Sequence, residues 1–272
     1  MLYASIRKHK PNRLFIIADG PRSVKEQAAV NAAREVWNQI DWPCEITRIY
    51  SDINLGCRKR VVTGLDLVFS QVERSLILED DCIPNDSFFS YAEELLVKYS
   101  NTDTIWTISG TTFASKVHAN SYLFSSYSLI WGWATWSRAW KHYKDSIDDN
   151  SDVLKNKFGY GWRYCYWRWI FYKVKTNKRD SWAYRWMLSH WRENAYAIIP
   201  PYSLVNNHGI TPEATHTKHQ SYDIMPTKNW SIPSHPSIVE LSQALDDDIE
   251  NHCYSRTIAQ RIKWFKLRFF KS

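Results

Sequence analysis

The stretch Arg74-Ser-Leu-Ile-Leu-Glu-Asp-Asp81 decides how the rest of the chain is interpreted. Its apolar run, Leu76–Leu78, is typical of a strand buried on both faces of a parallel sheet. Glu79, Asp80 and Asp81 follow directly, and burying three like charges is unfavourable unless a cation or hydrogen-bond donors meet them. Because ligands of open α/β sheets bind beside the carboxyl ends of the strands, the stretch predicts a site for an oxygen-preferring divalent cation. The alternative is a solvent-exposed acidic turn that caps the next helix.

Strands and helices alternate on both sides of this stretch. Strands are predicted at residues 13–18, 44–50, 76–78 and 104–109, and helices at 23–40, 58–69 and 86–99. This alternation predicts the α/β class, with a mostly parallel, Rossmann-like sheet flanked by helices. Beyond residue 110 the pattern gives way to an aromatic-rich half.

The composition narrows the class of protein. The chain has 272 residues with 15 Trp and 16 Tyr, concentrated after residue 120, where they form either a sugar-stacking surface or a bulky core. The net charge of +7 fits an anionic ligand, an anionic membrane surface or nucleic acid. The five Cys residues include no CxxC pair, which favours a reducing, cytoplasmic compartment and no zinc site. We see no signal peptide, and no apolar run approaches ~18 residues.

The C-terminal segment has its own pattern. Four apolar residues fall on one helical stripe between residues 256 and 271, with Arg and Lys at other positions. This is typical of an interfacial helix on an anionic membrane surface, and equally of a helix docked on its own domain. We therefore expect one domain at 1–240, with a nucleotide-binding half at 1–110 and an acceptor half at 111–240, followed by a basic tail at 241–272.

Several blocks of the chain resemble a known family. The blocks are Asn54–Cys57, Val68-Phe69, Leu76–Pro84, Phe88-Phe89, Trp131–Trp140, Asp180–Trp186 and Ser203–Asn207. In this order they resemble the GT-A fold nucleotide-sugar glycosyltransferases. They are similar to the branch that includes N-acetylglucosaminyltransferase I, and more closely to bacterial transferases of surface polysaccharide synthesis.

The resemblance implies roles on the donor side. Asp81 would bind Mn²⁺ or Mg²⁺ directly, with Asp80 close to the ribose or to the waters of the metal. Asp19 would contact the nucleobase, and Arg58 and Arg60 would contact the nucleotide.

The resemblance also implies roles around the acceptor. Asp180 would be the catalytic base, although Asp at this position also suits a helix N-cap. His216 would complete the metal shell or contact phosphate, with His208 as a weaker candidate. In the Trp131–Trp136 run, one or two rings would stack on an acceptor or donor sugar and the others would be buried. Trp131, Trp133 and Trp182 are the candidates for acceptor binding.

These residues predict a metal-dependent, inverting glycosyltransferase that moves a sugar from a nucleotide diphosphate to a glycan or lipid-linked acceptor. We expect it to act in surface polysaccharide synthesis, in the cytoplasm or at the inner face of the membrane. A nucleotidyltransferase would need a Gly-rich basic loop after the first strand, which we do not find. A non-catalytic glycan-binding module remains a further alternative. A nucleic-acid partner is not expected, because no binding motif is present.

Overall fold

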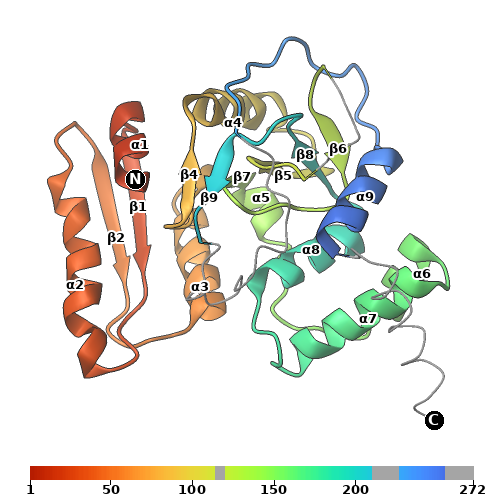
Figure 1. The fold of residues 1–272 in the computed structure, drawn as a ribbon, viewed down its shortest axis with the longest axis horizontal. Helices are drawn as coiled ribbons and strands as arrows, with labels where there is room; N and C mark the ends of the chain where they lie inside the picture. Colours follow the sequence, from red (N-terminus) through yellow and green to blue (C-terminus); the bar gives the residue numbers. More distant parts are fainter. Residues whose placement is uncertain (114–119, 210–226, 255–272) are drawn as a thin grey trace.

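A computed structural model describes residues 1–113, 120–209 and 227–254; His216 and most of the basic tail lie outside these ranges. The elements are, in chain order, α1 (Leu2–His9), β1 (Arg13–Ala18), η1 (Val24–Glu26), α2 (Gln27–Glu35), η2 (Val36–Gln39), β2 (Glu45–Tyr50), α3 (Cys57–Phe69), β3 (Arg74–Ile77), β4 (Cys82–Pro84), α4 (Asp86–Lys98), β5 (Ile105–Ser109), β6 (Leu123–Ser125), β7 (Trp133–Trp136), α5 (Ser137–Trp140), α6 (Ser151–Phe158), α7 (Trp162–Lys175), α8 (Trp182–Arg192), β8 (Tyr196–Ile199), β9 (Val205–Asn207), α9 (Gln243–Ile249) and η3 (Glu250–Tyr254). The mixed α/β class is therefore confirmed (Figure 1). Within the described ranges, no helix is both long enough and apolar enough to cross a membrane.

The N-terminal layer is a two-stranded parallel sheet. β1 and β2 pair in register from Arg13 opposite Glu45 to Ala18 opposite Tyr50. Figure 1 shows α2 along the outer side of this pair and α3 between it and the rest of the molecule. α3 comes close to β1 because residue 64 is glycine: a Cβ there would lie 2.7 Å from Cγ2 of Ile17. The layer therefore brings the end of β1 next to the first turn of α3.

A five-stranded sheet forms the centre, in the order β3-β7-β5-β8-β6. Only β5 and β8 pair in parallel, whereas the pairs β3–β7, β5–β7 and β6–β8 are antiparallel. The expected mostly parallel sheet is not confirmed, and Leu76–Leu78 is only partly buried. The physical reason is that β7, from the aromatic half, lies between β3 and β5, and local hydrophobic patterns predict strands without specifying their partners.

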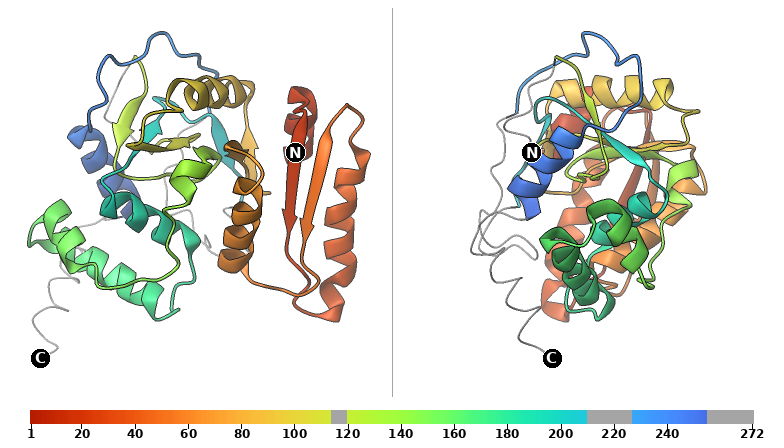
Figure 2. Two further views of the ribbon diagram at one scale, coloured as in Figure 1. Left: turned by 180° about the vertical axis from the view of Figure 1, so that it is seen from behind. Right: turned by 90° about the vertical axis from the view of Figure 1, so that its right-hand side faces the viewer.

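A short antiparallel pair, β4 and β9, lies beside the acidic run. Pro84 is opposite Val205, and Cys82 is opposite Asn207. Because β4 begins directly after Asp81, this pairing brings residues 207–209 next to the third carboxylate of the run. Figure 2 shows the whole fold from behind and from the side.

Most tryptophans of the second half are core residues. Trp133, Trp167 and Trp186 have no exposed surface. Trp186 of α8 packs against Trp133 of β7 at a centroid distance of 6.1 Å, and Trp167 of α7 packs in a second cluster with Trp191 of α8. Of the two interpretations of the aromatic excess, the bulky core accounts for these three rings.

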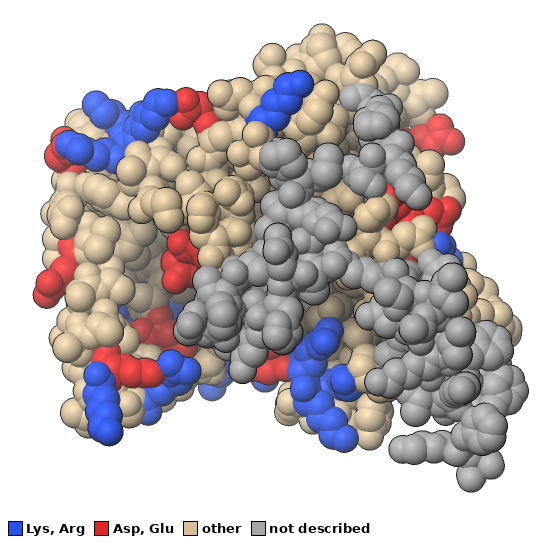
Figure 3. Space-filling model, in the orientation of Figure 1, with Lys and Arg blue, Asp and Glu red and all other residues tan. Residues whose placement is uncertain are grey.

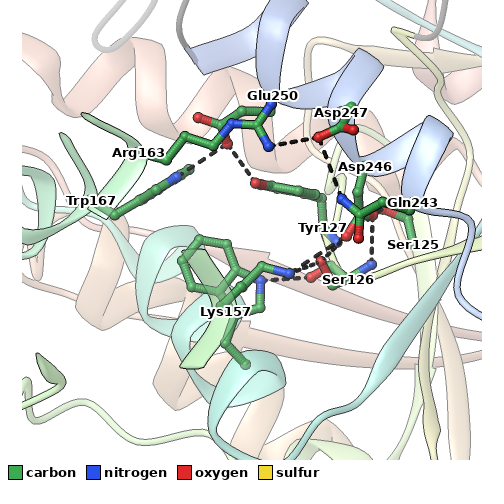
Figure 4. A network of polar contacts seen from close by, with 11 residues as sticks. Ser125, Ser126, Tyr127, Lys157, Arg163, Trp167, Gln243, Asp246, Asp247 and Glu250 are labelled. Atoms are coloured by element: carbon green, nitrogen blue, oxygen red, sulfur yellow. Dashed lines mark hydrogen bonds and ion pairs between the residues drawn. The ribbon is translucent and has the colours of Figure 1, made fainter. Parts of the chain in front are cut away.

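Helix α9 packs on β6 through apolar and ionic contacts. Leu245 and Ile249 belong to the same hydrophobic cluster as Ile199 of β8. Asp246 accepts hydrogen bonds from Ser125 Oγ (2.6 Å) and the Ser126 amide (3.0 Å), as Figure 4 shows. Residues 243–249, the beginning of the segment set apart as a tail, are thus packed against the central sheet.

Candidate functional site

Asp19 holds the turn that leads into α3. Its Oδ1 accepts the amides of Gly20 (2.9 Å) and Leu55 (2.8 Å), and its Oδ2 accepts the amide of Gly56 (2.9 Å). Gly56 has φ +79°, a left-handed conformation that favours glycine. Both carboxylate oxygens are used by the backbone, which gives Asp19 a structural role. Its contact with a nucleobase stays a prediction.

Arg58, one residue into α3, joins two acidic side chains from distant parts of the chain. Its Nε donates to Asp180 and its Nη1 donates to Asp145. These hydrogen bonds, the one to Asp145 first, raise the pKa of Arg58. The expected base, Asp180, and an expected nucleotide ligand, Arg58, are therefore direct partners.

Asp145 is a site residue that the sequence did not reveal. It lies on the loop after α5, and Arg185 Nε donates to its backbone oxygen at 2.6 Å and lies 3.4 Å from its Oδ1. Burial opposes ionisation of Asp145, but its contacts with Arg58 and Arg185 outweigh this and lower its pKa. A signal was present in Arg185, a charged residue between Tyr184 and Trp186 in the apolar and aromatic first half of α8.

The acidic run follows β3 and is partly buried. Glu79 Oε1 has no hydrogen-bond partner among the residues that the structure describes. Burial first, and then the charges of Asp81 and Asp80, raise the pKa of Glu79 to about 7. Burial and the charge of Asp80 also raise the pKa of Asp81, against opposing hydrogen bonds from Cys82 and Asn207. A bound cation would relieve this electrostatic cost.

The two residues after β9, His208 and Gly209, lie against Asp81. The His208 amide donates to the backbone oxygen of Asp81 at 2.8 Å, while the His208 side chain is exposed. Gly209 lies so close that a Cβ there would be 1.9 Å from Asp81 Oδ2. Sequence reasoning missed Gly209, because its proximity to Asp81 depends on the pairing of β4 with β9.

The thiol of Cys57 marks the point where the acidic groups converge. Cys57 is exposed as a whole residue, but neighbouring atoms desolvate its thiol. Its pKa is raised to about 11, first by desolvation and then by the negative charges of Glu79, Asp180, Asp19 and Asp80. Asp19, directly after β1, and Asp180, just before α8, contact residues 56 and 58 at the start of α3, and the charges of Glu79 and Asp80 reach the same turn.

Arg60 is buried next to this cluster. Its side chain is only 7% exposed, and its Nε and Nη2 have no hydrogen-bond partner among the described residues. Burial lowers the pKa of Arg60, and the charge of Asp19 opposes the shift. Buried donors without an acceptor are unfavourable, so an acceptor group from a ligand would stabilise this guanidinium.

Two of the three expected acceptor-stacking tryptophans are in the core. Trp133 is 0% exposed and Trp182 is 3% exposed, and they stack on each other with centroids 5.6 Å apart. A buried ring has no face for a sugar, so the stacking prediction is wrong for Trp133 and Trp182. Trp131 is partly exposed and contacts Phe113 edge to face at 5.2 Å, and its role in acceptor binding stays a prediction.

The described residues contain no ready group of three or more His, Cys, Asp or Glu side chains that could hold a metal ion. The unpaired buried oxygen of Glu79 and the mutual repulsion of residues 79–81 nevertheless fit a cation. Mg²⁺ and similar ions are commonly held by one or two carboxylates with substrate phosphates as further ligands. The site therefore fits a metal that binds together with a phosphorylated substrate.

Comparisons of the sequence add no further assignment. No protein-family model matches the chain, and no curated protein matches it. The functional argument therefore depends on the geometry around α3.

Proposed function

We propose that this chain is a metal-dependent, inverting glycosyltransferase that uses a nucleotide-diphosphate sugar. The observation that carries the proposal is that Asp19 and Asp180 meet at the first turn of α3, where Asp19 accepts the Gly56 amide at 2.9 Å and Arg58 donates to Asp180. The negative charges of Glu79 and Asp80 reach Cys57 in the same turn. These groups are far apart in the sequence. Their convergence supports a common site.

The finer assignment of the fold belongs to the same proposal. A GT-A-like fold is supported by the parallel β1–β2 pair with α2 and α3 beside it, and by the acidic run that follows β3. The antiparallel β7 at the centre means that any likeness is to a mixed sheet. We infer the likeness from the β1–β2 layer and the arrangement of the site, and the strand directions of the five-stranded sheet do not contribute.

Asp180 would accept the proton of the acceptor hydroxyl. Its side chain is half-exposed, so a substrate can reach it, and Arg58 fixes its orientation from one side. Asp145 holds Arg58 in turn, which makes Arg58 and Asp145 positioning residues. A carboxylate so placed contributes about 10²–10⁴-fold to a rate as a general base.

Asp81, with Glu79 and Asp80 beside it, would hold Mn²⁺ or Mg²⁺. A divalent ion at such a site neutralises the charge that develops on the departing diphosphate. Arg60 would donate to an acceptor oxygen of the nucleotide, because its buried donors lack partners in the described structure. The acceptor would be a glycan or a lipid-linked saccharide at the inner face of the membrane, in surface polysaccharide synthesis.

The test is donor hydrolysis and sugar transfer with a panel of nucleotide sugars, in Mn²⁺ and in EDTA. We expect Asp81→Asn and Asp180→Asn to reduce the rate by at least about 100-fold, as loss of a metal ligand or a general base does. Asp52→Asn, an exposed carboxylate on the loop before α3, is the matched control. Equal rates in the wild type and both site variants, or no dependence on the metal, would remove the assignment. Glycan binding that is indifferent to EDTA, without nucleotide binding, would favour the non-catalytic alternative.

A further inference from the structure

Two segments of the chain are strongly cationic, the basic tail and residues 153–179. Residues 153–179 contain eight Lys or Arg, nine aromatic residues and no Asp or Glu. Residues 256–271 of the tail contain six Lys or Arg and no Asp or Glu, so the rest of the chain carries a net negative charge. Residues 153–179 comprise most of α6 and all of α7, which lie at one edge of the molecule (Figure 1).

The inner side of α7 is a core surface. Trp167, Ile170, Phe171 and Val174 are at most 1% exposed and pack in the hydrophobic cluster that also contains Leu188 of α8. α7 is therefore fixed to the fold, and its other side presents a rigid surface.

The outer side alternates cations with tyrosines. We call it the α6–α7 face and define it by six residues, Lys155, Tyr160, Arg168, Tyr172, Lys175 and Lys178. Tyr160 is 68% exposed and Tyr172 is 55% exposed. The ammonium of Lys155 lies 5.1 Å from the ring centroid of Tyr160, and that of Lys178 lies 5.7 Å from Tyr172. In Figure 3, Lys and Arg gather in the lower middle of the view, where Figure 1 places the C-terminal end of α7.

We propose that the α6–α7 face docks on an anionic membrane surface. Tyrosines with an apolar ring and a polar tip settle at the level of the headgroups, and lysines beside them reach the lipid phosphates. The outer side of a single helix is convex, whereas proteins that bind single-stranded nucleic acid track the backbone in a groove. Residues 153–179 contain no carboxylate, which reduces repulsion by the lipid charge. One carboxylate, Asp149, lies near the face: hydrogen bonds from Ser151, and then the charges of Arg168 and Lys175, lower its pKa.

Docking through this face would also set the position of the candidate site. α7 ends at Lys175, and Asp180 follows five residues later, paired with Arg58. The bilayer surface would therefore lie near the Arg58–Asp180 pair, where a lipid-linked substrate could reach it. The docking itself does not depend on the proposed catalytic activity, because it follows from charge and exposure alone.

The experiment is co-sedimentation of the full chain with vesicles of phosphatidylcholine, alone or with one quarter phosphatidylglycerol. A triple variant, Arg168→Gln, Lys175→Gln and Lys178→Gln, removes three cations from the face. We expect its partition onto the anionic vesicles to fall about 100-fold, since each Lys or Arg near such a surface contributes about one factor of five. The control, Lys25→Gln, Lys98→Gln and Lys141→Gln, changes the net charge equally at exposed sites elsewhere and should bind like the wild type.

A double variant tests the contribution of the exposed tyrosines to vesicle binding. Tyr160→Ser with Tyr172→Ser should weaken binding at high salt, where the contribution of charge is screened. Circular dichroism and thermal unfolding would establish that each variant is folded. Three results would each overturn the proposal. The first is an equal loss of binding in the charge variant and its control, and the second is no preference for anionic vesicles. The third is binding of an oligonucleotide or an anionic glycan in place of vesicles.

Discussion

Replacing Asp19 by Asn tests whether this residue holds the fold or contacts a ligand. The carboxylate accepts three backbone amides, two of them from residues 55 and 56 at the entry to α3. Asn retains one acceptor oxygen. Its NH₂ group would face either the Gly56 amide or the amides of Gly20 and Leu55, and it cannot accept a hydrogen bond from them. Hydrogen bonds to charged groups contribute about 1.5–3 kcal/mol each, so losing at least one of them, with the carboxylate charge, should destabilise the protein by about 2–3 kcal/mol.

The assay is urea unfolding followed by tryptophan fluorescence, which the many buried indole rings make sensitive. With a slope of about 2–3 kcal/mol/M, the midpoint should fall by about 1 M. Asp52→Asn, with an exposed carboxylate near the same turn, should unfold like the wild type. An Asp19→Asn protein that is as stable as the wild type, yet binds nucleotide more weakly in calorimetry, would refute the structural role and support a direct contact.

Three further predictions follow from buried groups. Asp246→Ala should destabilise the protein by about 3–5 kcal/mol, because it leaves the Lys157 ammonium buried without its carboxylate. Asp247→Ala removes a half-exposed ion pair with Arg163 and should destabilise the protein by at most about 1 kcal/mol. Similar urea midpoints for the two variants would contradict this prediction. Trp133→Ala should lower the free energy of unfolding by about 3–5 kcal/mol, because the ring is fully buried, and thermal unfolding would measure the loss. A stable variant with only a raised KM for the acceptor would instead support the sugar-stacking role. In EDTA, the free energy of unfolding should fall as the pH rises from 4.5 towards 7, because the folded state favours neutral Glu79, whose pKa is raised to about 7. Glu79→Gln should flatten that part of the pH profile. An unchanged profile in the variant would show that the charge of Glu79 is already compensated in the fold.

The sequence predicted elements well and their pairing poorly. Residues 13–18 form a strand as expected, and the helices at 58–69 and 86–99 begin and end within one residue of their predicted bounds. These elements have strong local signals, such as the unbroken apolar run of β1 and the polar residues before α4. The cap expected from the sequence was Asp86, whereas in the structure it is Asn85, which accepts the Phe88 amide at 3.1 Å. The antiparallel position of β7 has no local signal, because it depends on which distant edge accepts Trp133–Trp136.

The same division holds for the site. Chemistry that resides in one short segment, such as the three carboxylates at 79–81, was visible from the sequence. Asp145 and Gly209 were not, since their importance arises only when α8 and β9 bring them to Arg58 and Asp81. The prediction that Trp133 and Trp182 stack on a sugar was wrong for a related reason. An aromatic run has the same composition whether its rings face a cleft or a core.

The packing of α9 has a practical consequence for anyone who expresses pieces of this chain. A fragment that stops at residue 240, where the composition changes, would lose Leu245 and Ile249 from the hydrophobic cluster and expose one side of β6. Cys253, in the short π-helical turn after α9, belongs to the same cluster. The smallest fragment that we expect to be soluble therefore extends at least through residue 254.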